Sequence, residues 1–239
     1  MATFKILLLN MGYGLGIDGS VKDYAAKWYR YLHCPAGIKD SVLKGIKNLI
    51  KNKKPDLCGL IEIEGSHADY FSKECRYFDI TNKYGPKSVL SRLPAFRSKS
   101  NAVFSRENFP IKRLYFRNGT KKLIYEVSLP KNITLFMTHF SLSKNTREKQ
   151  FKEIAKRAKN KKKVILCGDF NIFYGLQELE PLLTSTRLQI VCKNKTFPAS
   201  RPKKALDLFL CSKNIKVKAC KAIHKQLSDH LPVILEIEL

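Results

Sequence analysis

The chain has 239 residues, enough to bury a substantial core in one domain or two. Hydrophobic residues make up 44% of it and aromatic residues 10%, as is typical of a globular protein. The longest early apolar run, residues 6–9, is far shorter than the ~20 residues that a membrane helix needs, so we expect no transmembrane segment. Polar Asn10 follows this short run directly, so we also expect no cleaved signal peptide.

The chain is strongly basic, with 45 Lys and Arg against 20 Asp and Glu and a formal net charge of +25. Such an excess attracts polyanions through a long-range field, and nucleic acid is the partner that we expect first. An anionic membrane surface is the alternative. A third interpretation is compositional, because Lys greatly outnumbers Arg, as AT-rich coding would produce without any function attached.

Seven cysteines are scattered along the chain without a CxxC pair. An odd number without ligand spacing argues against a disulfide framework and against a zinc site. Cys58, Cys167 and Cys211 lie in apolar runs, so we interpret them as small core residues. These features favour a reducing, cytoplasmic location, with export that needs no leader sequence as the alternative.

The expected elements follow from apolar periodicity. Strands are predicted over residues 4–10, 56–62, 102–105, 123–128, 133–139, 164–167, 205–211 and 231–239. One helix is expected to start at an Asp40 cap and to end near Lys54, a second to start at Thr146, and a shorter third to span residues 176–183. No linker divides the chain, so we expect a single domain over residues 1–239. The mixture of alternating and successive strands predicts a layered α/β sandwich, with sheets packed face to face and helices outside.

Polar side chains interrupt the apolar strands at places where a buried core cannot use them. They are Asn10, Glu62, His139, Asp169 with Asn171, and Asp229 with His230. A sixth interruption, Asp207, lies within the strand at 205–211, where a charge is costly unless it is paired. If these strand ends converge at one edge, they form a single site rich in carboxylates, amides and imidazoles.

Such a site favours one kind of chemistry. The hard oxygen ligands Glu62, Asn10 and Asp229 suit Mg²⁺ or Mn²⁺. Histidines and amides can hold a phosphate and its developing charge, and Asp169 can orient or deprotonate an attacking water. The sequence therefore predicts metal-assisted hydrolysis of a phosphoester.

The same positions lie in motifs that resemble those of the endonuclease/exonuclease/phosphatase superfamily, the deoxyribonuclease-like metal-dependent phosphohydrolases. The matching segments are residues 9–10, 55–62, 101–106, Thr138-His139-Phe140-Ser141-Leu142, Gly168-Asp169-Phe170-Asn171, Leu206-Asp207 and Ser228-Asp229-His230-Leu231-Pro232. They occur in family order across nearly the whole chain. The resemblance implies a four-layer α/β sandwich of two packed mixed β-sheets flanked by helices.

The resemblance also implies a role for each position. Glu62 would be the principal metal ligand, with Asn10 beside it and Asp229 nearby, and the ion would be Mg²⁺ or Mn²⁺. Asp169 would orient the nucleophilic water. Leu208 departs from the pattern, because members often carry His or Tyr there.

The resemblance implies four further positions that act on the phosphate and one that orients a histidine. Asn171 would bind it and stabilise the transition state. His230 would contact the scissile phosphate or act as a base, and Asp207 would fix its tautomer. His139 would donate to a phosphate oxygen or to the leaving group, and Arg106 would be an additional phosphate contact.

The substrate is a separate question. Abasic-site endonucleases of the superfamily usually carry Tyr at the position of His139, so a repair role of that type is disfavoured. The net charge then favours a nuclease acting on DNA or RNA. One alternative is a phospholipid (sphingomyelinase-like) or inositol-phosphate hydrolase of the same fold, and another is a non-catalytic polyanion-binding protein.

Overall fold

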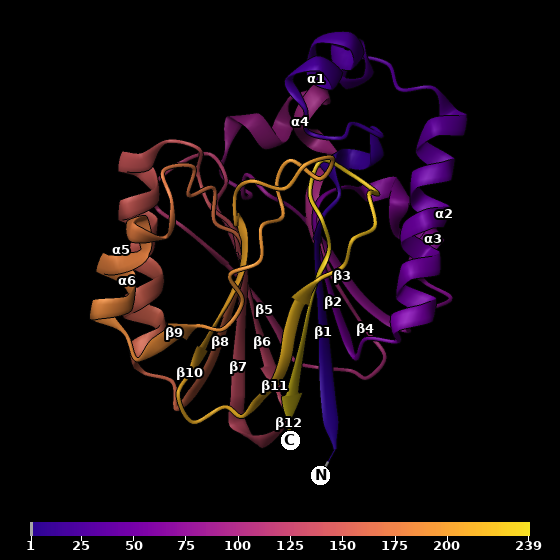
Figure 1. Cartoon of the computed structure of the whole chain (residues 1–239). Coiled ribbons are helices and arrows are strands. Elements are labelled where there is room, and N and C mark those ends of the chain that lie inside the picture. Colours follow the sequence, from indigo (N-terminus) through magenta and orange to yellow (C-terminus); the bar gives the residue numbers. More distant parts are fainter. Residues whose placement is uncertain (1) are drawn as a thin grey trace.

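Two six-stranded sheets pack face to face in the computed structural model, which describes residues 2–239 (Figure 1). The first sheet has the order β11 (Val217–Ala222), β12 (Val233–Glu238), β1 (Thr3–Asn10), β2 (Leu57–Glu64), β4 (Lys99–Ser105), β3 (Tyr77–Asn82). The second has the order β5 (Ile111–Tyr115), β6 (Leu123–Leu129), β7 (Ile133–His139), β8 (Lys163–Asp169), β10 (Asp207–Ser212), β9 (Leu188–Ile190).

Helices cover both outer faces of the sandwich. Helices α2 (Ala36–Lys53) and α3 (Ala68–Phe71) lie on the first sheet, and α5 (Lys144–Lys159) and α6 (Glu180–Ser185) lie on the second (Figure 1). The short helices α1 (Val21–Lys27) and α4 (Pro94–Arg97) lie at one end. Six 3-10 helices complete the described elements: η1 (Gly12–Gly14), η2 (Trp28–Tyr31), η3 (Gly65–His67), η4 (Val89–Arg92), η5 (Pro130–Asn132) and η6 (Leu176–Leu179). The four layers confirm the fold that the sequence implied.

The two sheets share one pattern of connections. In each sheet a central parallel pair is joined through a covering helix, β1–α2–β2 in the first and β7–α5–β8 in the second. The other strand pairs are antiparallel. Parallel strands end at the same edge of their sheet, so the carboxyl ends of β1 and β2 lie together, as do those of β7 and β8.

Alternation along the strands explains how both faces become buried. In β1, Ile6 and Leu8 point between the sheets, whereas Leu7 and Leu9 pack beneath α2. Strands that are buried on both faces consist of continuous apolar residues, which is why these strands could be predicted from the sequence. The sheets approach closely at Gly59 on β2, where an added Cβ would lie 2.2 Å from the sulfur of Met137 on β7.

Helix boundaries differ from the sequence predictions at three places. Helix α2 begins before Asp40, which instead pairs with Lys44 inside the helix. Helix α5 begins after Ser143, so Thr146 is not its cap. The third predicted helix is divided into η6 and α6, because Pro181 favours the first turn of a new helix.

The sequence also missed strands β3, β5, β9 and β11. The first two and β11 are edge or near-edge strands with few buried side chains, so they lack an apolar run. The seven cysteines are free thiols, and Cys58, Cys167 and Cys211 are buried in the core as predicted. Within residues 2–239, no helix combines the length and apolar character that crossing a bilayer requires.

Candidate active site

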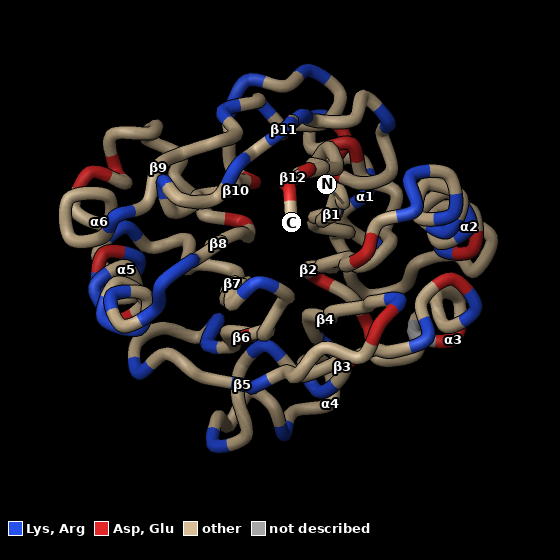
Figure 2. Tube along the Cα trace, turned by 90° about the horizontal axis from the view of Figure 1, so that it is seen from below, with Lys and Arg blue, Asp and Glu red and all other residues tan. Residues whose placement is uncertain are grey.

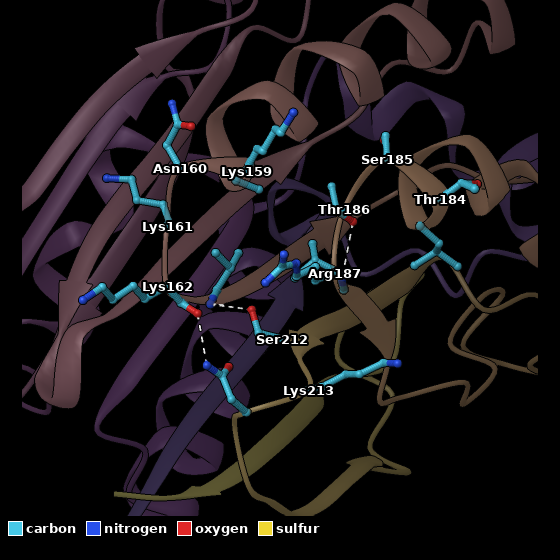
Figure 3. A pocket seen from close by; sticks show the side chains of 15 residues that line it. Lys159, Asn160, Lys161, Lys162, Thr184, Ser185, Thr186, Arg187, Ser212 and Lys213 are labelled. Carbon is cyan, nitrogen blue, oxygen red and sulfur yellow. Dashed lines mark hydrogen bonds between the residues drawn. The ribbon is translucent and has the colours of Figure 1, made fainter.

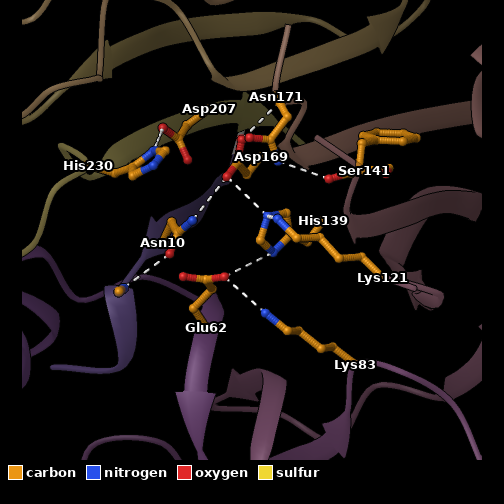
Figure 4. Close-up of polar contacts among 12 residues, drawn as sticks. Asn10, Glu62, Lys83, Lys121, His139, Ser141, Asp169, Asn171, Asp207 and His230 are labelled. Atoms are coloured by element: carbon orange, nitrogen blue, oxygen red, sulfur yellow. Dashed lines mark hydrogen bonds and ion pairs between the residues drawn. The ribbon is translucent and has the colours of Figure 1, made fainter. Parts of the chain in front are cut away.

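The strand ends meet across the gap between the two sheets (Figure 4). Asn10 at the end of β1 donates from Nδ2 to Asp169 Oδ2 at the end of β8, at 3.0 Å. Glu62 Oε1 lies 3.8 Å from His139 Nδ1, and His139 Nε2 lies 3.3 Å from Asp169 Oδ2. The four side chains therefore form one cluster to which each sheet contributes two members.

Glu62 enters this cluster through a β-bulge. The sequence predicted that its strand ends there, but β2 continues to Glu64, and its register with β4 shifts between Leu60 and Ile63. Glu62 has φ +56°, a conformation that is uncommon outside glycine and that turns its side chain toward the site. Its backbone N–H, displaced from the ladder, donates to Asn101 Oδ1 at 3.2 Å. The bulge thus positions the carboxylate without leaving the backbone unpaired.

Two lysines that the sequence analysis did not assign to the site, buried Lys83 and half-buried Lys121, contact the cluster. Lys83 donates to Glu62 Oε1 at 2.9 Å and to the hydroxyl of Tyr13, and Lys121 donates to His139 Nε2. Burial lowers the pKa of Lys121 to about 8. Burial works against ionisation of Glu62, but Lys83 and Lys121 outweigh it and lower the pKa of that carboxyl to about 2. Glu62 is therefore a carboxylate at neutral pH.

His139 is held as a neutral imidazole. Burial, together with Lys121 and Lys83, keeps the pKa of His139 well below its usual range. A lysine ammonium can only donate, so Nε2 accepts and Nδ1 carries the hydrogen. Buried Nδ1 has no hydrogen-bond partner among the described residues and faces the gap beside Glu62.

His230 is held in the opposite charge state. Its Nδ1 lies 2.6 Å from Asp207 Oδ2, and although burial acts against the charge, Asp207 raises the pKa of His230 to about 10. Thr196 donates to the same carboxylate oxygen at 2.6 Å, and the ring of Phe197 lies 5.0 Å from that of His230. Thr196 and Phe197 thus support this pair although Leu208 offers no polar group.

Both carboxylate oxygens of Asp169 accept hydrogen bonds that fix the orientation of the side chain. Oδ2 accepts from Asn10, and Oδ1 accepts from the backbone N–H of Asn171 at 3.0 Å. Burial raises the pKa of Asp169 to about 6. Asn171 has φ +52° and donates from Nδ2 to Phe140 O at 2.9 Å, which fixes its amide beside the cluster.

Asp229 borders the cluster from the loop before β12. Tyr24 on α1 donates to its Oδ2 at 2.6 Å, and burial raises the pKa of Asp229. Its Oδ1 is buried without a partner among the described residues. Gly12, at φ +49°, lies against this oxygen, and a Cβ there would be 2.8 Å from it. Only glycine allows this approach of the backbone.

The donor atoms fit a hard dication. Ligand atoms of Asp169, Asp207 and His230 lie within 4.8 Å of one another, which is a possible metal site. His230 would have to lose its proton to ligate an ion there. Asn10, Glu62 and Asp229 stay the predicted ligands, and their oxygens are of the kind that Mg²⁺ and Mn²⁺ prefer. The free Oδ1 atoms of Asp207 and Asp229 are buried polar atoms that a bound cation or its water would satisfy.

Arg106 is a wrong prediction. It follows Ser105, which pairs with Leu57 at the start of β2, so it lies at the opposite end of the sheet from Glu62. Its sequence position beside a matching motif gave no information on which end of the strand faces the site. Lys83 and Lys121 are the cations that the structure brings to the cluster instead.

A separate basic pocket lies at the far end of the second sheet (Figure 3). Its charged lining residues are Lys159, Lys161, Lys162, Arg187 and Lys213, and no Asp or Glu is among the described residues that line it. Strand β8 starts beside this pocket at Lys163 and ends at Asp169, so the strand's length separates the pocket from the cluster. The pocket has no carboxylate for metal-assisted chemistry.

The model of the Endonuclease/Exonuclease/phosphatase family matches residues 32–230. The chain belongs to this family. The matched range contains Glu62, His139 and Asp169 of the cluster, and Asn10 lies before it. Among curated proteins, none matches the chain significantly.

Solved structures share the fold of this chain at low identity. A family protein from Leptotrichia buccalis is 18% identical with a TM-score of 0.72, covering 99% of this chain and 100% of that one. TDP2 of D. rerio complexed with single strand DNA product is 15% identical, with a TM-score of 0.69 and complete coverage of both chains. A mannosyl-6-phosphatase from Bacteroides thetaiotaomicron is 13% identical, with a TM-score of 0.70, covering 99% and 100%. These likenesses show that the chain shares the fold of the three proteins.

Proposed function

We propose that the chain is a Mg²⁺- or Mn²⁺-dependent phosphodiesterase. The observation that carries this proposal is the Asn10–Asp169 hydrogen bond of 3.0 Å, which places the oxygen ligands of one sheet against the carboxylate of the other. Glu62, Asn10 and Asp229 would hold the ion, which would polarise the phosphate when bound.

Asp169 would orient the attacking water. Hydrogen bonds from Asn10 and Asn171 fix its two oxygens. The carboxylate is therefore held in one orientation, in which a lone pair can accept from a water in the gap. With a pKa near 6, Asp169 is mostly ionised at neutral pH and is suited to accept a proton from water.

The two histidines would divide the phosphate contacts. His230, charged through its contact with Asp207, would donate from Nε2 to a phosphate oxygen, which favours the donor role over the base role. Neutral His139 would donate from Nδ1 toward the leaving group or a phosphate oxygen. Asn171 would contribute its amide to the same anionic centre.

Nucleic acid is the first candidate substrate. The net charge of +25 favours polyanions, and Lys and Arg surround the sandwich on all sides (Figure 2). The similar fold of TDP2, which was solved with a DNA product, is consistent with this choice and adds no specificity.

A phospholipid is the second candidate, and the surface near the site favours it. Val21, Leu32 and Val89 are exposed at 86%, 81% and 72%, on segments next to the cluster. Aliphatic side chains cannot stack on bases, whereas they can enter a lipid surface.

A substrate panel tests both candidates. The purified chain would be assayed with Mg²⁺ on single-stranded DNA, RNA, phospholipid vesicles and a soluble phosphomonoester. Asp169→Asn is expected to lose roughly a hundredfold or more in kcat, and Lys213→Gln in the remote pocket is the matched surface control. Equal activity of the Asp169→Asn protein and the wild type would refute the mechanism. Binding of polyanions without turnover of any ester would favour the non-catalytic alternative.

A further inference from the structure

The end of the sandwich that holds the cluster also carries an exposed apolar surface. Its side chains come from two segments, residues 21–32 of α1 and η2 and residues 89–96 of η4 and α4. We call them the apolar rim, and they are Val21, Trp28, Leu32, Val89, Leu93 and Phe96. Figure 1 shows α1 and α4 at this same end. A concentration of exposed apolar groups at one end indicates a contact surface.

Contacts connect both segments of the rim to the cluster. Tyr31 of the first segment lines a small hollow together with Gly12 and Asp229. Phe96 of the second packs edge-on against Tyr84 at 5.6 Å, and Tyr84 follows Lys83, the partner of Glu62. The two segments therefore stand on different sides of the cluster, one beside Asp229 and the other beside Lys83.

The charges around the rim are positive. Residues 86–99 contain no acidic residue, and their cations are Lys87, Arg92 and Arg97, together with Lys99, which pairs with Glu64 at 3.0 Å. In residues 21–32, Lys22, Lys27 and Arg30 outnumber Asp23, which already pairs with Lys27 at 2.5 Å. Apolar side chains set among uncompensated cations match a surface that is both apolar and anionic.

The geometry points to one partner: we propose that the apolar rim docks on an anionic phospholipid membrane, with the catalytic cluster facing the lipid headgroups. The most exposed rim members, Val21, Leu32 and Val89, are aliphatic and have no ring face for a base. Trp28 is 62% exposed, and an indole is suited to the boundary between headgroups and acyl chains. Docking goes beyond the proposed function, since it does not depend on which ester is hydrolysed.

Trp28 provides the probe, because it is the single tryptophan of the chain. The intact protein in EDTA would be mixed with vesicles of phosphatidylcholine and phosphatidylserine in equal amounts, with phosphatidylcholine vesicles, or with single-stranded DNA. We expect a blue shift of Trp28 emission and co-sedimentation with the phosphatidylserine vesicles, and a much weaker response to phosphatidylcholine alone.

Two variant sets separate apolar from electrostatic binding. Leu32→Ser with Val89→Ser is expected to weaken vesicle binding at least tenfold, and Tyr77→Ser, an exposed residue on β3 outside the rim, is the control that should bind normally. Lys87→Gln with Arg92→Gln should weaken binding about tenfold or more, whereas Lys159→Gln with Lys213→Gln in the remote pocket should have a smaller effect.

Docking would be overturned by an unchanged Trp28 emission with phosphatidylserine vesicles, or by rim variants that bind as well as the wild type. A Trp28 response to single-stranded DNA and not to vesicles would also overturn it, and would identify the rim as a nucleic-acid surface. These measurements involve no turnover, so a failed substrate panel and a failed docking test remain distinguishable.

Discussion

Lys83 Nζ lies 2.9 Å from Glu62 Oε1, so the carboxylate proposed to bind a dication already pairs with a buried ammonium group. A metal that binds Glu62 must compete with this cation. We therefore expect Lys83→Met to raise Mn²⁺ affinity about tenfold, by removing a like charge from the site. Lys99→Met is the matched control, because Lys99 pairs with Glu64 instead, at 3.0 Å. Calorimetric titration of the apo protein with Mn²⁺ would measure both, and weaker binding by Lys83→Met would show that the lysine supports the site.

Thr196 is expected to act on catalysis through Asp207. Thr196→Val keeps the shape of a fully buried side chain but removes the 2.6 Å hydrogen bond to the carboxylate that orients His230. We expect kcat to fall about tenfold, with rescue by Thr196→Ser. Thr186→Val, whose hydroxyl bonds Leu182 O in the remote pocket, should leave kcat unchanged. A Thr196→Val enzyme as active as the wild type would exclude this support.

Much of the cluster could be predicted from sequence because its members follow apolar strands. Asn10, His139 and Asp169 each end a strand whose two faces are buried, so the change from apolar to polar is sharp. Lys83 and Lys121 gave no such signal, since Lys83 follows β3, which has no buried side chain, and Lys121 lies in the basic loop before β6. Their proximity depends on long-range pairing, in which the Lys122 N–H donates to Lys83 O at 2.8 Å.

The wrong sequence predictions concern positions that depend on residues far away in the chain or on competing local signals. Glu62 was predicted to end its strand, but it lies in a β-bulge inside the strand. A bulge depends on the pairing with the neighbouring strand, and apolar periodicity carries no information on that pairing. The helix starts were misplaced because Asp40 and Thr146 satisfy capping preferences at positions that lie inside longer helices. Arg106 was assigned by its neighbours in sequence, and antiparallel β4 carries it to the other end.

Gly168 is expected to be essential for stability. It has φ +150°, and a Cβ there would lie 1.8 Å from Thr138 O on the neighbouring strand β7. Gly168→Ala should therefore lower the free energy of unfolding by about 4 kcal/mol or more. Gly37→Ala in helix α2 is the control, because nothing lies within 4 Å of its added Cβ and alanine favours helix. Urea denaturation would compare them, and equal midpoints would contradict the steric argument.

His67 should make the protein less stable in mild acid. Burial is the main cause that lowers the pKa of His67 from 6.5 to about 4, and its Nδ1 accepts from the Glu64 N–H. Between these pH values the unfolded chain binds more protons, so stability falls as pH drops from 6.5 toward 4 and is retained above 6.5. His67→Phe should flatten this part of the curve of Tm against pH. Parallel curves for the two proteins would show that His67 does not contribute.

The contact of Gly59 with Met137 has a consequence for how the enzyme would lose activity. The missing side chain of Gly59 lets the two sheets pack closely at Met137. The Asn10–Asp169 hydrogen bond joins the same two sheets, so it depends on their relative position. A small rigid-body slip of one half against the other would separate the metal ligands from the water-orienting carboxylate while every strand stayed intact. Heating or pressure should therefore abolish turnover before circular dichroism reports any loss of secondary structure.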